Sequence, residues 1–509
     1  MRRRAFAATL SILLAMLLVS ASPSKSTKKK ATAKAVAATT TTQQPPPVVP
    51  PSNGGCLSPP RVTTTLPADA AASDQADFNC FAWQEFISLN WTASTTTAGQ
   101  PNTSIPASQF GTPNDNTPKV WETYMNPGDV FRPNALPPLP WGTGSGQTKA
   151  KALKHLGMFS KFDSGAVTLD LSDFTPAFTN SWLTAQNGYL TLFEIRLNQD
   201  EYNYINDPNG LYNAKTQQTF VVNPGINLPA GKTSYGPVGA IEVKAAWIEL
   251  DDPSLWPYFK TSKAYVTYPS DPSSPQLVTV GLVGLHIIHK TPSGQQFIWA
   301  TFEHVNNAPS TTDISGNTLL NWYTYYNLNC NPQTDHYGCQ QNKEPVAGTD
   351  PYSAPVQVVR TNPIMTSSTD NIAGLNYYVW QQIAAANPNS VYLNYQLVNV
   401  LWPNNNTMIQ PGATTPLTQG NSQPTTAVTY VANTTLETYF QNNAQCLDCH
   451  TGAPIASVTS GNVVKIRSTR GPNAVAVGSS ATYASDYSFL FSSAQTPPST
   501  AIVPKPKPK

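Results

Sequence analysis

Two cysteines and a histidine near the C-terminus have the types and spacing for a definite chemistry. Cys446, Cys449 and His450 follow the order Cys-x-x-Cys-His within QNNAQCLDCHTG, in a chain of 509 residues that has six cysteines and six histidines. This order is typical of c-type haem attachment. Thiols one helical turn apart can form thioethers with the vinyl groups on one porphyrin edge, and the adjacent histidine is then held beneath the iron. We therefore expect one covalent haem c, with His450 as proximal iron ligand.

Two other kinds of site use closely spaced cysteines. A redox dithiol of the thioredoxin type requires a βαβ setting and makes no use of the adjacent histidine. A zinc ion requires four ligands, and the sequence has no second Cys/His pair at the usual spacing. Both alternatives remain open, but haem c is the favoured interpretation.

The N-terminus predicts export, which covalent haem attachment requires. Arg2, Arg3 and Arg4 form a positive region, Ala5 to Val19 is apolar, and small residues precede a cut after Ala21. The apolar run has about 15 residues, fewer than the ~20 that span a bilayer. We therefore expect residues 1–21 to be a cleaved signal peptide, without a transmembrane anchor, and the mature chain to be periplasmic or otherwise extracytoplasmic.

Both ends of the mature chain are basic and lack the composition of a folded core. Residues 22–55 form a Lys/Thr/Pro-rich stretch and residues 495–509 a second basic tail, and both are expected to be disordered. Without the signal peptide and these tails, 19 Lys and Arg stand against 28 Asp and Glu. This negative charge argues against nucleic acid as a partner, while the tails could associate weakly with anionic surfaces.

Short apolar segments between proline and glycine breaks predict a β-dominated α+β fold. We expect a β-rich body over residues 56–430 and a haem-binding segment, 431–494, packed on it. The clearest element is a hairpin over residues 275–305, whose two apolar runs flank the turn sequence TPSG. Its first strand should be buried on both faces, because both sides of that run are apolar.

Three further elements and the helix of the haem motif can be placed from pattern. Residues 240–250 are expected to form a strand, and residues 74–91 and 371–387 to form helices, the first capped by Asp74 or Asp77. Thr434 and Glu437 have the spacing of a capping box, which predicts that a helix begins there and carries the motif. Gly452 and Pro454 should end that helix.

The iron's sixth position has no protein ligand downstream of the motif, because the 59 residues after His450 contain no Met, His or Cys. Any such ligand must come from upstream. The candidates in the mature chain are Met125, Met158, Met365, Met408, His155, His286, His289, His304 and His336.

The predicted hairpin is the best candidate to cover the haem, since it is the most apolar segment and carries three histidines. We expect His304 to approach the iron, or failing it His286 or His289, with Glu303 close enough to His304 to influence its protonation. Alternation along a strand places His286 and His289 on opposite faces. Met408, in a polar Asn/Thr loop, is the alternative ligand. His336 lies in a polar loop and should be at the surface.

The other four cysteines suit an oxidising compartment, where disulfides are expected. Cys330 and Cys339 would close a small polar loop, and Cys56 and Cys80 would tie the start of the body to its first helix. Four cysteines allow three connectivities, and this local pairing is the simplest of them.

Four phrases of the sequence resemble a family of exported bacterial proteins known as cytochrome c family proteins. They are FNCFAWQEFISLNW, GLVGLHIIHKTPSGQQFIWATFEHVNNAP, NPNSVYLNYQLVNVLWP and ANTTLETYFQNNAQCLDCH, and the resemblance extends over residues 76–494. It implies one c-type haem on Cys446, Cys449 and His450, and it assigns no catalytic residue.

Three functions are compatible with one haem in a body of this size. Electron transfer with a redox partner protein, or with a small-molecule donor or acceptor, requires nothing beyond the attached haem and is the expected function. A haem oxidoreductase with an open distal site is the alternative, and a haem-based binding or sensing protein is a third possibility. No Ser/His/Asp arrangement or phosphate-binding loop is recognisable.

Overall fold

The computed structural model describes most of the chain between residues 55 and 498. The described residues are 55–71, 74–143, 154–157, 181–221, 224–268, 271–366, 371–402, 431–442, 446–450, 453, 455–459, 462–464 and 485–498. Only the backbone is described for 154–157, 271–273, 448, 449, 457–459 and 462–464. All of them belong to one compact unit, Gln44–Lys509. The predicted signal peptide and almost all of the predicted tether lie outside the described residues.

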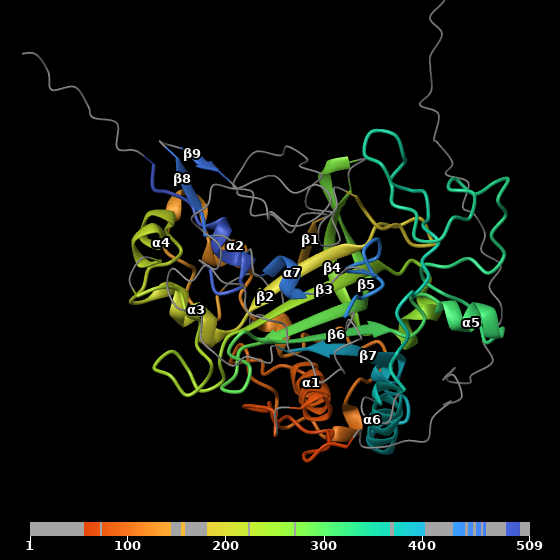
Figure 1. The fold of residues 1–509 in the computed structure, drawn as a ribbon, viewed down its shortest axis with the longest axis horizontal. Helices are drawn as coiled ribbons and strands as arrows, with labels where there is room; N and C mark the ends of the chain where they lie inside the picture. The colour runs from red at the N-terminus through yellow and green to blue at the C-terminus, as the bar shows by residue number, and fades with distance from the viewer. Residues whose placement is uncertain are drawn as a thin grey trace, which may run out of the picture. The chain divides into compact units, whose positions relative to one another are not determined.

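A mixed sheet of seven strands organises the described part of the chain (Figure 1). Its strands are β1 (Lys154–Gly157), β2 (Leu192–Leu197), β3 (Ile241–Glu249), β4 (Thr261–Tyr268), β5 (Asp271–His289), β6 (Ile298–His304) and β7 (Tyr395–Leu401). β1 pairs with β4 in parallel, and all other neighbours are antiparallel. A separate pair is formed by β8 (Ser457–Thr459) and β9 (Asn462–Val464).

The expected hairpin is the centre of this sheet. β5 pairs with β6 from His289 opposite Ile298 to Gly284 opposite Glu303, and with β3 on its other side. Thr291 and Gly294 close the turn through reciprocal backbone hydrogen bonds of 3.3 and 3.1 Å. The strand expected over 240–250 is β3. Residues 279–285 and 287–289 of the first hairpin strand are buried, as expected for a strand covered on both faces, but residues 274–277 at its start are exposed.

Seven α-helices surround the sheet among the described residues. They are α1 (Gln75–Leu89), α2 (Pro127–Val130), α3 (Gln199–Asn206), α4 (Ala214–Phe220), α5 (Thr311–Gly316), α6 (Ile372–Ala386) and α7 (Cys446–His450). The two helices predicted from pattern are α1 and α6. Asp74 caps α1 by accepting the N–H of Asp77 at 2.9 Å, so this part of the prediction is confirmed.

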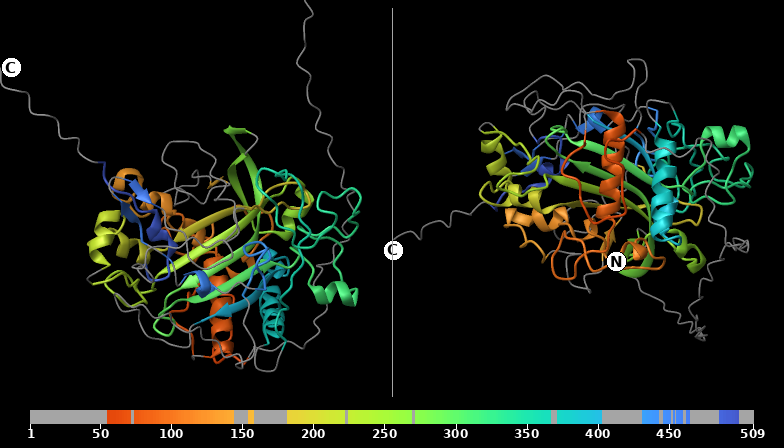
Figure 2. Two further views of the ribbon diagram at one scale, coloured as in Figure 1. Left: turned by 45° about the horizontal axis from the view of Figure 1, so that its top comes forward. Right: turned by 90° about the horizontal axis from the view of Figure 1, so that it is seen from below.

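α1 and α6 lie side by side across one face of the sheet, while α7 lies on the other (Figure 2). Asn376 of α6 joins this helix to β7. Its side chain bonds both backbone groups of Leu397 at 2.9 and 3.0 Å. Trp83 of α1 donates to the same Asn376 oxygen at 2.9 Å. A buried amide thus joins both helices to the sheet, since each of its polar atoms finds a partner.

Alternation along β5 defines the two faces. Leu285, Ile287 and His289 lie on the face covered by α1, here called the helix face; His289 stacks on Phe81 of α1. Gly284, His286 and Ile288 lie on the opposite face, here called the motif face, which carries α7 and residues 431–442. The expectation that His286 and His289 point to opposite faces agrees with this arrangement.

The fold is mixed α+β, as predicted, with helix and strand in comparable amounts among the described residues. The expected predominance of strand is therefore not what the described residues show, because short helices and 3-10 turns fill the connections between the strands. None of the described helices has the length and apolar composition that crossing a bilayer requires.

Both expected disulfides are present. Cys56 pairs with Cys80 of α1 across a Cα–Cα distance of 6.2 Å, and Cys330 pairs with Cys339 across 6.0 Å. Disulfides persist in oxidising compartments, so the two bridges are consistent with the predicted extracytoplasmic location.

The cap of α1 gives a first testable prediction. Asp74→Ala removes the side-chain acceptor of the Asp77 N–H and should lower the free energy of unfolding by about 1 kcal/mol. Asp74→Asn keeps an acceptor oxygen and serves as the matched control. Urea denaturation followed by circular dichroism measures both variants, and equal losses in the two would show that the cap bond is not responsible.

Candidate functional site

The motif lies on α7, a helix of five residues, Cys446–His450, on the motif face of the sheet. Leu447 is buried in an apolar cluster that includes Trp299 of β6, and Cys446 is half-buried against the same cluster. Residues 448 and 449 are helical, although their side chains lie outside the description. Helical spacing places residues 446, 449 and 450 within about one turn, as attachment to one porphyrin edge requires.

His450 is fixed in orientation by residues from two other parts of the chain. Its Nδ1 lies 2.7 Å from the backbone carbonyl oxygen of Tyr487 and donates to it. Its ring centroid lies 4.4 Å from that of Trp299 and 4.9 Å from that of Phe489. A histidine that donates from Nδ1 presents the lone pair of Nε2, which is the arrangement of histidines that ligate metal ions.

The carbonyl that holds His450 is itself held by an unusual backbone. Asp486 and Tyr487 have φ values of 50° and 70°, in the left-handed region that non-glycine residues seldom occupy. Asp486 bonds the Lys290 ammonium at 2.5 Å and the Leu228 N–H at 2.7 Å, which keeps this turn in place. The turn at residues 485–488 therefore positions the histidine, and surrounding contacts outweigh its backbone strain.

Burial lowers the pKa of His450 to about 4, because the imidazolium form would lose its hydration. The bond to Tyr487 and the Glu437 carboxylate act in the opposite direction, while Lys244 and His286 lower the pKa further. His450 is therefore neutral near pH 7, and neutral imidazole is the form that binds a metal ion.

Residues 431–437 attach to the motif face through buried polar contacts. The Asn433 amide donates to the carbonyl oxygen of Phe302 at 2.7 Å and to Thr301 Oγ1 at 3.2 Å. Thr434 donates from its backbone N–H and its hydroxyl to Glu303, at 3.1 and 2.8 Å. The contact is close: a Cβ at Gly284 would stand 3.0 Å from Asn433 Oδ1.

The predicted capping box of Thr434 and Glu437 is wrong in its detail. The Thr434 hydroxyl bonds Glu303 of the sheet, and Glu437 accepts the N–H of Asn433 at 2.8 Å, so Asn433 stands where the cap was expected. Residues 434–442 form turns, and α7 begins only at Cys446. Contacts with the sheet have replaced the local helix. The expected stop at Gly452 and Pro454 lies outside the described residues.

Glu437 also reaches His286 of β5. Its Oε2 lies 3.3 Å from His286 Nε2, and the two side chains are 11% and 13% exposed. The attraction of His286 and the N–H of Asn433 lower the pKa of Glu437 despite its burial, so the carboxylate is charged near neutral pH. This pair stands beside the motif, since Ile288, on the same face of β5 as His286, belongs to the apolar cluster that holds Leu447 of α7.

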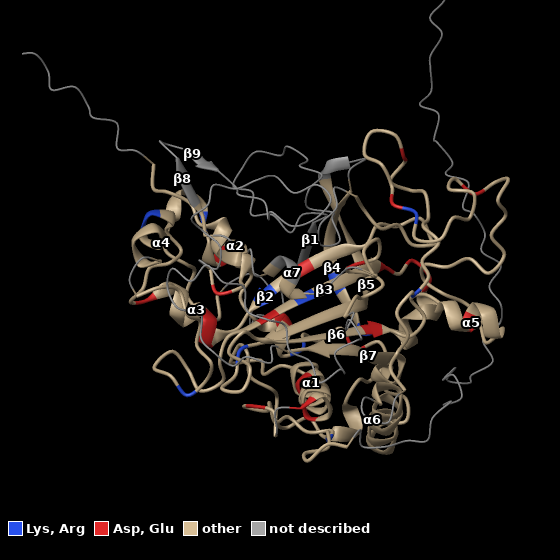
Figure 3. Cartoon of the chain, viewed as in Figure 1, with Lys and Arg blue, Asp and Glu red and all other residues tan. Residues whose placement is uncertain are grey.

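Three half-buried side chains interrupt the buried strands of the motif face. Ile195 pairs in register with Lys244, and Lys244 with His286, so the three stand side by side on β2, β3 and β5. Each is half-buried, whereas its neighbours along the strand are buried. Figure 3 shows that charged residues occur on the central strands as well as in loops. We call Lys244, His286 and Thr301, which pairs with His286, the polar row.

The ring of His304 is bonded to backbone groups at both nitrogens. Its Nε2 donates to the carbonyl oxygen of Tyr258 at 2.9 Å, and its Nδ1 accepts the N–H of Asn306 at 3.1 Å. Burial lowers its pKa to about 4. Both ring nitrogens are therefore engaged with backbone groups, which leaves none for iron. Glu303 is also not its partner, because Glu303 bonds Thr434 and Arg360.

His289 is likewise structural. It forms a buried ion pair with Glu85 of α1 through Nδ1, and its Nε2 lies 3.0 Å from the Val238 carbonyl oxygen. The first choice among the hairpin histidines therefore passes from His304 to His286, which alone of the three shares a face with the motif. Sequence alternation separates His286 from His289, but it cannot show which face the motif occupies.

The other candidate ligands fall into three groups. Met125 is buried in the apolar cluster that also holds Leu447 and Trp299, and Met365 packs against the separate cluster of the helix face. His336 pairs with Asp350 at 2.8 Å in an exposed position, as expected. Met158, Met408 and the side chain of His155 lie outside the described residues.

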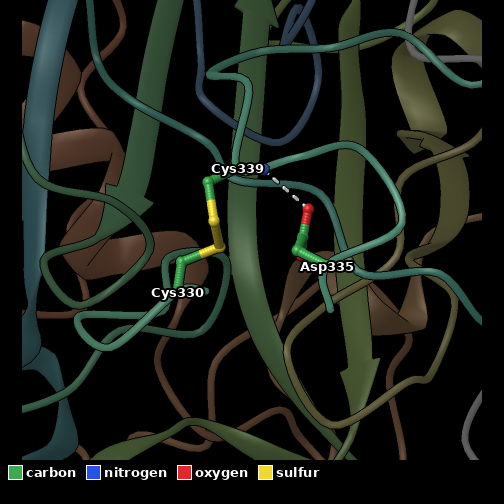
Figure 4. Close-up of side chains that lie close together, drawn as sticks. All are labelled: Cys330, Asp335 and Cys339. Atoms are coloured by element: carbon green, nitrogen blue, oxygen red, sulfur yellow. Dashed lines mark hydrogen bonds between the residues drawn. A yellow bond between two sulfur atoms is a disulfide. The ribbon is translucent and has the colours of Figure 1, made fainter. Parts of the chain in front are cut away.

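A cluster of potential metal ligands elsewhere is better explained by a disulfide. Cys330, Asp335 and Cys339 have ligand atoms within 4.8 Å of one another. The two sulfurs are bonded to each other, and Asp335 accepts the backbone N–H of Cys339 at 2.9 Å (Figure 4). Sulfurs in a disulfide are not thiolate ligands, so Asp335 stabilises a cross-linked loop.

Sequence reasoning missed the residues that surround His450. Tyr487 contributes a backbone carbonyl, which no side-chain pattern reveals. Lys244 is recognisable in the sequence as the single basic residue of a largely apolar strand, and Trp299 as an aromatic residue on the hairpin, but only the tertiary structure places them near the motif.

No family model, curated protein or solved structure matches this chain. Its function must therefore be inferred from the site.

The attachment of residues 431–437 gives a second prediction. Asn433→Leu removes the donors to Phe302 and Thr301 and leaves buried acceptors unpaired, so the free energy of unfolding should fall by about 1–3 kcal/mol. Asn389→Ala, in an exposed loop, is the control and should change stability little. Denaturation curves measure both, and an unchanged midpoint for Asn433→Leu would contradict the role given to this amide.

Proposed function

We propose that the chain is an exported monohaem c-type cytochrome that transfers electrons through one haem attached to Cys446 and Cys449, with His450 as proximal ligand. The observation that carries this proposal is the arrangement of His450. Its Nδ1 donates to the Tyr487 carbonyl at 2.7 Å, so that Nε2 is the nitrogen suited to iron. The resemblance to exported bacterial cytochrome c family proteins supports the same function.

The surroundings of the motif fit a haem. Leu447, Trp299 and Phe489 offer apolar and aromatic surface beside the histidine. The half-buried Ile195, Lys244 and His286 interrupt the buried stretches of β2, β3 and β5, and Ile195 packs against the cluster that holds Leu447. A bound haem would supply an iron that accepts and releases one electron, with a potential set by its ligands and by nearby charge. The short haem-bearing helix would lie on the large α+β body.

Electron transfer is preferred because it requires of the protein only that the haem be held and its iron ligated on both sides. His286 is a described candidate for the second side, since it lies on the motif face two residues from Ile288, which belongs to the apolar cluster that holds Leu447. The partner would be a redox protein or a small-molecule donor or acceptor on the extracytoplasmic side. The two disulfides are consistent with that location.

One observation favours a second function, a haem-dependent oxidoreductase. His286 and Glu437 form a histidine–carboxylate pair with a separation of 3.3 Å. Such a pair can accept and return a proton when it stands next to a reacting group. In this alternative His286 would act as an acid or base beside an open iron face and would not ligate the iron. Spin state separates the two functions.

Covalent attachment is tested by substitution of the two motif cysteines. Cys446→Ala with Cys449→Ala should abolish haem-dependent peroxidase staining on a denaturing gel, since no thioether can then form. Cys330→Ala with Cys339→Ala is the matched control, because it removes two cysteines of a disulfide and should leave the stain intact. A wild-type protein whose haem is extracted by acid-acetone would contradict the proposal.

The sixth position is tested by optical and electron paramagnetic resonance spectra. We expect oxidised wild type to be low-spin and His286→Ala to become largely high-spin, because the variant loses a strong-field nitrogen ligand. His336→Ala, in an exposed loop, should have the wild-type spectrum. A high-spin wild type would instead favour the oxidoreductase, and a low-spin His286→Ala variant would show that another residue ligates the iron.

A further inference from the structure

Lys244 is a cation in an unusual place for a structural residue. It lies in the middle of β3, between β2 and β5 in the sheet, and its neighbours Val243 and Ala245 are fully buried. Its register partner His286 stands beside it on the motif face. Its ammonium lies 5.6 Å from the centre of the Phe193 ring, a contact that uses its charge only weakly.

A lysine in such a position needs a compensating anion, because transfer of an ammonium from water into a protein interior is costly unless the charge is paired. Burial lowers the pKa of Lys244, and Glu437 is the carboxylate that raises it. Glu437, however, is already engaged: it accepts the Asn433 N–H at 2.8 Å and lies 3.3 Å from His286 Nε2. The Glu437 carboxylate is thus shared by the Lys244 ammonium, the His286 ring and the backbone N–H of Asn433.

The position of Lys244 relative to the motif indicates where a further anion would come from. Ile195, the register partner of Lys244 on β2, packs against the apolar cluster that holds Leu447 of α7, so the polar row adjoins the place where a group held by the motif would lie. Haem carries two propionate carboxylates on the edge of the porphyrin away from the vinyl groups. Attachment to Cys446 and Cys449 through the vinyl groups would therefore leave both carboxylates for other parts of the site.

We propose that Lys244 binds a propionate carboxylate of the attached haem. Its ammonium would then balance the negative charge of that carboxylate. This inference rests on the proposed haem attachment and adds the residue that recognises the acidic edge of the cofactor. Two consequences follow. The carboxylate completes the partners of Lys244, and the ammonium favours the reduced iron, whose charge is lower by one.

The test compares the reduction potential of holoprotein variants at one pH. Lys244→Met keeps much of the side-chain length and removes the charge, so the potential should shift to a lower value than that of wild type. Lys244→Arg keeps the charge and should restore most of the difference. Lys263→Met on β4, whose ammonium bonds Thr279 and lies over Trp256, is the matched control and should keep the wild-type potential.

A second measurement can be made first on the wild-type protein alone. Resonance Raman spectra of wild type report the bending vibrations of the propionates, which differ between paired and solvated carboxylates. We expect the paired position in wild type and a shift in Lys244→Met. A solvated position in wild type, an unchanged potential in Lys244→Met, or an equal fall in Lys263→Met would each overturn the assignment.

Failure of this inference is distinguishable from failure of the proposed function. The haem stain on a denaturing gel is recorded first, and its absence from wild type would refute haem attachment itself, and with it the role of Lys244. Covalent haem present together with an unchanged potential in Lys244→Met would leave the cytochrome proposal standing and refute only the pairing with Lys244.

Discussion

The attachment of residues 431–437 to the motif face is the constraint on which the candidate site depends. Asn433 and Thr434 bond the strand β6 through buried groups, and Gly284 leaves the space for them. Buried polar groups are costly when unpaired, so this interface tolerates few alternative registers. It also carries Glu437 to His286, and the chain then continues into α7. Polar contacts thus act together with the apolar packing of Leu447 to place the motif against the sheet.

A second point of attachment comes from the other side of the motif in sequence. The turn at Asp486 and Tyr487, strained in its backbone and held by Lys290, presents a carbonyl to His450. The histidine is therefore oriented before any metal ion binds. Preorganisation of this kind is what a ligand requires if its geometry is to be kept in both oxidation states, because less rearrangement accompanies the gain or loss of an electron.

The two sides of the sheet perform different tasks. The helix face holds the largest apolar cluster, in which Trp83 and Phe86 of α1 pack on Phe302. The motif face combines apolar residues with the polar row. His286 lies on the motif face, whereas both ring nitrogens of His304 are bonded to backbone groups. Histidines that are close in sequence therefore have different surroundings in the fold. Charge on the motif face acts on His450 from the sheet, so the electrostatics of the site are a property of the fold.

The sequence alone determined the features that depend on local pattern. The motif of Cys446, Cys449 and His450 predicts a chemistry by its spacing, and the hairpin, the cap of α1 and both disulfides followed from residue types that act over short distances. Tertiary structure decided the rest. It replaced the predicted capping box with bonds to Glu303, and it placed His286, but not His304, on the motif face. Strand register and the pairing of buried polar groups made these choices, because they join residues from tens to more than a hundred positions apart and neither leaves a trace in any local stretch of sequence.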